Sequence, residues 1–185
     1  MKVVDLSEEI YSGMDVYPGD PKVTIEKFLT IKEDGYKVSK ISFGVHIGTH
    51  VDVPSHMIKK GKDLGKYSLN KFVGNAKIIN SANDITNDIT NDIKRSGIII
   101  LSDEFNPTKA STNKIIKLKP KLVGYTKKSE PNIDLTKKLL NADILLVGPL
   151  KIPKGLPQRF FFCAFPLKLR SLEGSPVRAV AITAF

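Results

Sequence analysis

The chain of 185 residues contains one cysteine, three histidines and no apolar run long enough to cross a bilayer. Cys163 alone cannot form a disulfide within the chain, and its apolar neighbours predict a buried thiol that packs as a small hydrophobe. The first residues include acidic side chains where a signal peptide needs an apolar stretch. The sequence therefore indicates a cytoplasmic protein without a transmembrane helix.

Acidic residues are also scarce, because 19 aspartates and glutamates face 29 lysines and arginines, a formal net charge of +10. Proteins that bind nucleic acid or anionic surfaces often carry such an excess. Here most of the basic residues are lysines scattered along the chain, not an arginine-rich helix. We interpret them as a solvated surface, and expect a small-molecule substrate with neither nucleic acid nor membrane as a partner. Salt-sensitive binding without sequence preference would instead indicate nucleic-acid association.

All three histidines fall within the eleven residues from His46 to His56, which read His-Ile-Gly-Thr-His-Val-Asp-Val-Pro-Ser-His. Histidine titrates near neutral pH and is the commonest neutral metal ligand. Its clustering beside Asp52 indicates metal binding or proton transfer. The alternative is three histidines held by ordinary hydrogen bonds.

The local conformation decides which of these side chains can meet. The β-branched Val51 and Val53 and the missing amide donor of Pro54 argue against a helix. A straight strand would hold His46 and His50 roughly 13 Å apart, too far for one metal. The chain must therefore bend at Gly48, with Thr49 hydrogen-bonding locally to hold the bend.

We interpret His46, His50 and Asp52 as metal ligands gathered by this bend at a strand end. His56, beyond Pro54, is then left free to move protons. One divalent metal is expected. Two imidazoles and one carboxylate suit zinc or manganese, and iron(II) as well.

The pattern His-x-Gly-Thr-His-x-Asp-x-Pro-x-His resembles the signature of the cyclase family, metal-dependent hydrolases that include bacterial kynurenine formamidase and isatin hydrolase. The likeness extends to both ends of the chain. Residues 4–7 and 16–21 look like the family's opening, and residues 165–168 and 174–179 look like its close. The resemblance implies one cyclase-like domain over residues 1–185 and a homo-oligomer, a dimer or tetramer.

The chain departs from the family where a second metal is bound. Alignment on Leu139 and Leu140 places Thr136 where the family has a histidine ligand and Gly148 where it has a glutamate. Neither residue is a ligand, and Asp52 with water alone is too small a set for tight binding. We therefore expect at most one metal.

These observations predict a metal-dependent hydrolase of a small-molecule amide or lactam, with an aryl formamide as the substrate class that the resemblance implies. A metal-activated water would attack the carbonyl, and His56 would carry the proton to the leaving amine. The alternative is a degenerate, non-catalytic member that keeps a vestigial metal site and acts as a binding or regulatory protein.

Other nucleophiles are weaker candidates. Cys163 has no histidine or asparagine partner near it in sequence, and its apolar setting would raise its pKa. Ser175 lies in a Gly-Ser-Pro turn and lacks the strand-turn-helix setting of a nucleophile elbow. Lys168 and Arg178 match family positions but receive no chemical role.

The fold class expected is α/β with a mixed, strand-rich sheet, and the resemblance implies the swivelling β/β/α domain. We predict strands at 3–6, 23–31, 36–45, 76–79, 98–101, 122–125, 144–147, 160–169 and 177–183. We predict helices through Ile85, Ile89 and Ile93, from a Ser111 or Thr112 cap to Leu118, and at 135–140. Turns are expected at Asp34-Gly35 and at 173–176.

Overall fold

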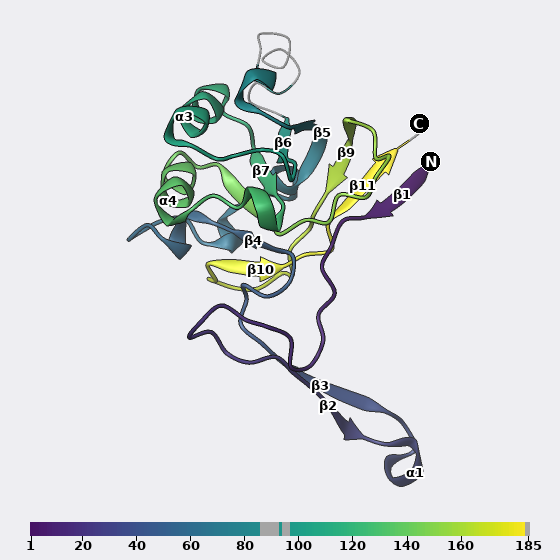
Figure 1. The fold of residues 1–185 in the computed structure, drawn as a ribbon. Coiled ribbons are helices and arrows are strands. Elements are labelled where there is room, and N and C mark those ends of the chain that lie inside the picture. Colours follow the sequence, from purple (N-terminus) through teal and green to yellow (C-terminus); the bar gives the residue numbers. More distant parts are fainter. Residues whose placement is uncertain (86–92, 94–96, 184–185) are drawn as a thin grey trace.

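The computed structural model of the chain describes residues 1–85, 93 and 97–183. Nine strands form one mixed sheet in the order β1-β11-β9-β5-β6-β7-β8-β4-β10, and β2 and β3 form a separate hairpin (Figure 1). This confirms the α/β class with a strand-rich mixed sheet. The strands of the main sheet are β1 Lys2–Asp5, β4 His50–Asp52, β5 Val73–Ile79, β6 Ile98–Leu101, β7 Leu122–Tyr125, β8 Leu145–Gly148, β9 Arg159–Cys163, β10 Gly174–Pro176 and β11 Val180–Thr183.

The centre of the sheet is parallel and buried on both faces. Strands β5, β6, β7 and β8 pair in parallel, and every residue of β6, β7 and β8 is buried. Within β6, Ile98 and Ile100 join one apolar cluster, whereas Ile99 and Leu101 join a second on the opposite face. The continuous apolar run from 98 to 101 thus predicted this interior strand correctly.

Two longer helices, α3 Lys109–Leu118 and α4 Ile133–Asn141, lie side by side next to strands β6 and β7 (Figure 1). The predicted cap of α3 was wrong, because Thr108 caps the helix and its Oγ1 accepts a hydrogen bond from the Ser111 amide at 3.1 Å. Ser111 returns a bond to the Thr108 amide, so the capping box starts the helix two residues before Ser111. The predicted helix through Ile85, Ile89 and Ile93 falls largely outside the described residues.

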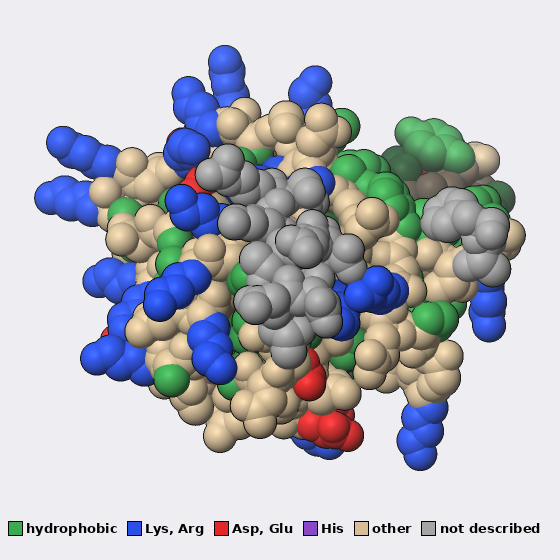
Figure 2. Space-filling view, turned by 90° about the horizontal axis from the view of Figure 1, so that it is seen from above, with side chains coloured by type: hydrophobic (Ala, Val, Ile, Leu, Met, Phe, Trp, Pro, Cys, Tyr) green, Lys and Arg blue, Asp and Glu red, His purple; other side chains and the backbone are tan. Residues whose placement is uncertain are grey.

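Short helices occupy the connections. They are α1 Ile31–Asp34 and the 3-10 turns η1 Pro54–His56, η2 Leu64–Lys66, η3 Leu69–Phe72, η4 Ala82–Asp84 and η5 Lys127–Ser129. Among the helices of the described part of the chain, none has the length and apolar character needed to span a membrane. Basic side chains project from several parts of the face seen in Figure 2 and do not form one stripe.

The hairpin of β2 Thr24–Leu29 and β3 Val38–Ser42 extends away from the main sheet as an arm, with α1 at its tip (Figure 1). The strand predicted at 36–45 therefore ends at Ser42, and the histidine motif does not lie at its end. The Asp34-Gly35 turn contains α1, which ends at Gly35 in the left-handed conformation (φ 79°).

The turn predicted at 173–176 was wrong, because Gly174–Pro176 is strand β10, antiparallel to β4. The strand predicted at 160–169 is shorter, since β9 ends at Cys163. β10 pairs with a segment more than 120 residues away, and such distant pairing has no local sequence signal. It completes the edge of the sheet where the histidine motif lies.

Candidate metal centre

The histidine motif begins in a bend and continues into β4. His50 and Asp52 lie two residues apart on this strand, so their side chains share one face. Gly48 makes the bend with φ +56°, and a Cβ there would meet Ile10 at 2.9 Å. The predicted bend at Gly48 is confirmed, and both its backbone angle and its close packing favour glycine.

Thr49 holds the bend through distant segments, not through the local hydrogen bond that we predicted. Its buried Oγ1 donates to the Pro149 carbonyl oxygen at 2.6 Å and accepts from the Glu8 amide at 2.8 Å. The amide of Val177 also donates to the Thr49 carbonyl oxygen at 2.9 Å. The bend is thereby fixed to three other parts of the chain.

The structure brings the three predicted ligands together. His46 Nδ1 lies 2.8 Å from Asp52 Oδ1, and His50 Nε2 lies 3.4 Å from the same oxygen. The ligand atoms of the three residues all lie within 4.8 Å of one another. Atoms bound to one metal at about 2.1 Å are at most about 4.2 Å apart, so this set suits a divalent cation after little or no movement.

Hydrogen bonds direct the imidazole of His50 toward this point. Its Nδ1 lies 3.0 Å from the Gly48 carbonyl oxygen, which can only accept, so Nδ1 carries the proton and Nε2 offers a lone pair. Burial lowers the pKa of His50, but the neighbouring Asp52 carboxylate outweighs it, and the net shift is upward. Burial raises the pKa of Asp52, but the neighbouring imidazoles of His46 and His50 outweigh it and lower the pKa. The site therefore keeps Asp52 ionised.

His56 lies beside the ligand cluster on the turn η1. Its ring is stacked obliquely on that of His46, with 4.1 Å between the centroids. Burial lowers its pKa from the ordinary value, which keeps the imidazole neutral near neutral pH. Gly61 packs directly behind this turn, where a Cβ would lie 2.5 Å from the Pro54 carbonyl carbon.

The two positions at which the resemblance implies ligands for a second metal contain none. Thr136 is buried, and its Oγ1 donates to the Pro131 carbonyl oxygen at 3.1 Å. Gly148 lies opposite His50 in the sheet, and a Cβ there would be 2.5 Å from the Tyr125 ring. The donor set thus fits one cation, and not a second at these positions.

Two glutamates near the centre escaped the sequence analysis. Glu173 Oε1 lies 3.7 Å from His46 Nε2. Burial raises the pKa of Glu130, whose carboxyl interacts electrostatically with His50 and Asp52. Glu173 directly precedes the Gly-Ser-Pro segment that matches the family's close, which was its only signal; nothing in the sequence marked Glu130.

The other residues considered in the sequence analysis make contacts that do not involve the histidine centre. Ser175 Oγ donates to the Pro176 carbonyl oxygen at 2.8 Å and accepts from the Leu167 amide at 3.0 Å. Cys163 is only partly buried, unlike the buried thiol that we predicted, and desolvation still raises its pKa, as its apolar setting predicted. Arg178 forms a two-pronged ion pair with Asp5 at 2.9 and 2.7 Å. Lys168 lines an apolar groove with Leu167 and Leu169.

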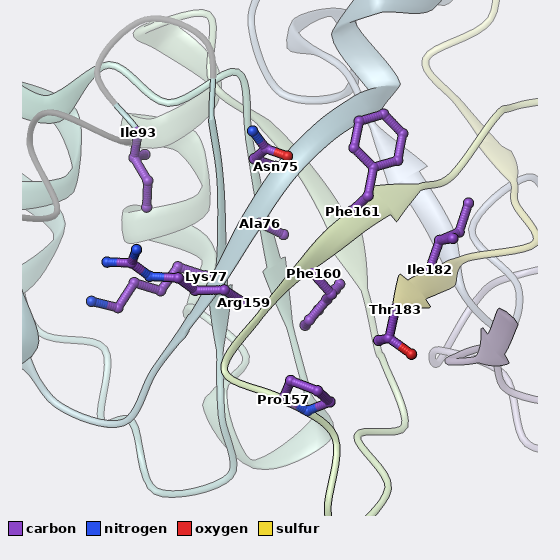
Figure 3. A pocket seen from close by; sticks show the side chains of 10 residues that line it. All are labelled: Asn75, Ala76, Lys77, Ile93, Pro157, Arg159, Phe160, Phe161, Ile182 and Thr183. Carbon is purple, nitrogen blue, oxygen red and sulfur yellow. The ribbon is translucent and has the colours of Figure 1, made fainter. Parts of the chain in front are cut away.

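A cavity of about 560 Å³ lies on the face formed by β5, β9 and β11 (Figure 3). Lys77 and Arg159 are directly opposite each other in the register and extend in the same direction, and Phe161 lies further along the sheet. None of the residues that line this cavity belongs to the histidine centre. It is therefore not the space beside the candidate ligands.

Sequence comparisons identify the class of protein. The family described as "Putative cyclase" matches residues 4–106. A protein of Methanocaldococcus jannaschii is 31% identical over 98% of this chain and 100% of its own length. The chain therefore belongs to the cyclase family. A kynurenine formamidase of Geobacillus thermodenitrificans is 28% identical over 95% of each chain.

Solved structures agree with this assignment. A crystal structure of an isatin hydrolase bound to the product analogue thioisatinate matches with a TM-score of 0.81 and 19% identity, over 98% of this chain and 92% of that one. The structure of a potential metal-dependent hydrolase with cyclase activity matches with a TM-score of 0.74 and 23% identity, over 97% of this chain and 96% of that one. These likenesses confirm the cyclase fold that the resemblance implied.

Proposed function

We propose that the chain is a cytoplasmic metal-dependent hydrolase that cleaves the C–N bond of a small-molecule amide or lactam, with aryl formamides as the favoured class. The observation that carries this proposal is the convergence of His46, His50 and Asp52, with the neutral imidazole of His56 stacked beside them. The named enzymes among the relatives, a formamidase and an isatin hydrolase, support the substrate class.

In this proposal His46, His50 and Asp52 hold one zinc or manganese ion. When bound, such an ion lowers the pKa of a water molecule and polarises a carbonyl oxygen. The ionised Asp52 supplies the negative charge that balances the cation. Because burial lowers the pKa of His56, its imidazole can accept a proton and deliver it to the nitrogen of the leaving amine.

The test begins with elemental analysis of protein purified without chelator and then offered zinc or manganese. We expect about one ion per chain, and its loss in His50→Ala. Screening aryl formamides and isatin should then give turnover that His56→Ala abolishes without changing the metal content. Unaltered turnover in His56→Ala would remove the role proposed for this residue.

A non-catalytic binding or regulatory role is the second candidate, favoured by the absence of ligands at Thr136 and Gly148. It predicts that wild-type protein turns over no formamide or lactam even when loaded with metal. Two ions per chain would contradict both candidate functions, because each assumes a single metal site. The second ion would require ligands other than His46, His50 and Asp52.

We further propose that the chain forms a homo-oligomer, a dimer or tetramer, through the β2–β3 arm. Among the described residues, β2 and β3 pair with each other and with no other strand, and the arm exposes Phe28 at 66% and Ile41 at 57% of their surfaces. Exposed apolar side chains gathered on a projecting element are typical of contact surfaces. Light scattering should give a mass of two or four chains, reduced by Phe28→Ser with Ile41→Ser, and a monomeric wild type would contradict this proposal.

A further inference from the structure

The two ring nitrogens of His46 face different carboxylates. Nδ1 lies 2.8 Å from Asp52 Oδ1 within the ligand cluster, and Nε2 lies 3.7 Å from Glu173 Oε1. Nε2 is buried and has no hydrogen-bond partner among the described residues. A cation that replaced the proton between Nδ1 and Asp52 would leave the imidazole proton on Nε2, where a buried donor without an acceptor is costly.

The imidazole of His50 has an orienting hydrogen bond that the imidazole of His46 lacks. The Nδ1 of His50 is anchored by the Gly48 carbonyl oxygen at 3.0 Å, which leaves its other nitrogen for the metal. No backbone carbonyl anchors His46 Nε2 in the described structure, and the Glu173 carboxylate stands 3.7 Å away. The side chain of Glu173 is 40% exposed, which leaves it free to rotate by the small amount that a hydrogen bond requires.

The backbone holds Glu173 in this place. Its carbonyl oxygen accepts a hydrogen bond from the Val53 amide at 3.1 Å, and the next residue, Gly174, pairs with Asp52 in the sheet. A Cβ at Gly174 would lie 2.9 Å from His46 Cε1, so the absence of a side chain allows β10 to approach the imidazole. The position of the carboxylate thus follows from the pairing of β10 with β4.

We propose that Glu173 is a positioning residue that accepts a hydrogen bond from His46 Nε2–H and thereby directs His46 Nδ1 to the metal. The inference rests on the metal site proposed above. Carboxylates that orient a metal-binding imidazole in this way fix its tautomer and raise its basicity, and their loss weakens metal binding by roughly 10-fold to 100-fold. In this proposal Glu173 is not itself a metal ligand and acts through His46.

The test measures zinc affinity by competition with a chromophoric chelator. We expect Glu173→Ala to weaken binding by roughly 10-fold. Glu173→Gln should lose less, because its amide oxygen still accepts the hydrogen bond. Glu130→Gln is the matched control, since it removes a negative charge that acts on His50 and Asp52 without touching His46. An equal loss in Glu130→Gln and Glu173→Gln would show a long-range charge effect and overturn the proposal.

A second measurement does not depend on affinity or turnover. The chain has three histidines, so the zinc-loaded protein labelled with ¹⁵N-histidine gives a simple spectrum. We expect the His46 Nε2 proton to be protected from exchange in wild type and to exchange rapidly in Glu173→Ala. If wild type binds zinc, and Glu173→Ala changes neither the exchange rate of the His46 Nε2 proton nor the zinc affinity, this inference alone is overturned. If wild type binds no zinc, the proposed metal site itself is overturned.

Discussion

Replacing Gly148 with alanine tests how the space opposite His50 is filled. The new Cβ would lie 2.5 Å from two atoms of the Tyr125 ring, closer than non-bonded carbon atoms approach. The Tyr125 side chain is only 4% exposed, so its ring cannot move aside into solvent. Overpacking of this kind costs about 1–3 kcal/mol, and we expect Gly148→Ala to lower the free energy of unfolding by about 2 kcal/mol.

Urea unfolding followed by far-ultraviolet circular dichroism measures this change. Gly65→Ala is the matched control, because a Cβ there meets only the Leu169 carbonyl oxygen at 3.9 Å, an ordinary contact. In a Tyr125→Leu background the smaller side chain should leave room, so that most of the cost of Gly148→Ala disappears. The same cost in both backgrounds would refute the reasoning, since contacting residues should couple by about 0.5–3 kcal/mol.

Three further changes test other parts of the site and its supports. Thr49→Val removes the hydroxyl bonded to Glu8 and Pro149, and urea unfolding should show a loss of about 1–3 kcal/mol for the backbone groups left unpaired. Gly61→Ala would push a Cβ into the backbone that carries His56, so turnover should fall while elemental analysis shows unchanged metal content. Burial raises the pKa of Asp143, but the Tyr67 hydroxyl and nearby lysines outweigh it and lower the pKa. Its stabilisation is therefore present above the unfolded pKa of about 3.9 and is lost as pH falls through the lower folded value. Asp143→Asn should cost at most about 1 kcal/mol near neutral pH, because the carboxylate is partly exposed, and the free energies of unfolding of the two proteins should begin to converge as pH falls below about 4 and agree below the folded pKa. A gap that persists in acid would contradict this assignment.

The histidine motif and the buried central strand were predictable from the sequence. Three histidines and an aspartate at fixed spacing left few arrangements that could serve one metal, and distance alone required a bend at Gly48. The buried strand at 98–101 was equally clear, because four consecutive apolar residues suit a strand covered on both faces. In these cases the local pattern and the final environment demand the same residues.

Long-range pairing was beyond the sequence. Gly174, Ser175 and Pro176 are typical turn residues, and only the partner strand β4 makes them a strand. The same pairing brings Glu173 to His46, so the missed glutamate and the missed strand have one cause. Thr49 is similar, because its hydroxyl bonds to residues that lie 41 and 100 positions away.

Local packing occupies the two positions at which the resemblance implies a second pair of metal ligands. A histidine at 136 would replace a hydroxyl that already satisfies the Pro131 carbonyl oxygen in a buried setting. A glutamate at 148 would collide with the Tyr125 ring, which belongs to the apolar cluster under α4. Thr136 is therefore used in a buried hydrogen bond, and the Tyr125 ring fills the space next to Gly148, opposite His50. A chain packed in this way can keep the ligand set of one metal intact, because the Gly48 bend and the pairing of β4 with β8 and β10 place His46, His50 and Asp52, and none of these supports requires a ligating side chain at 136 or 148.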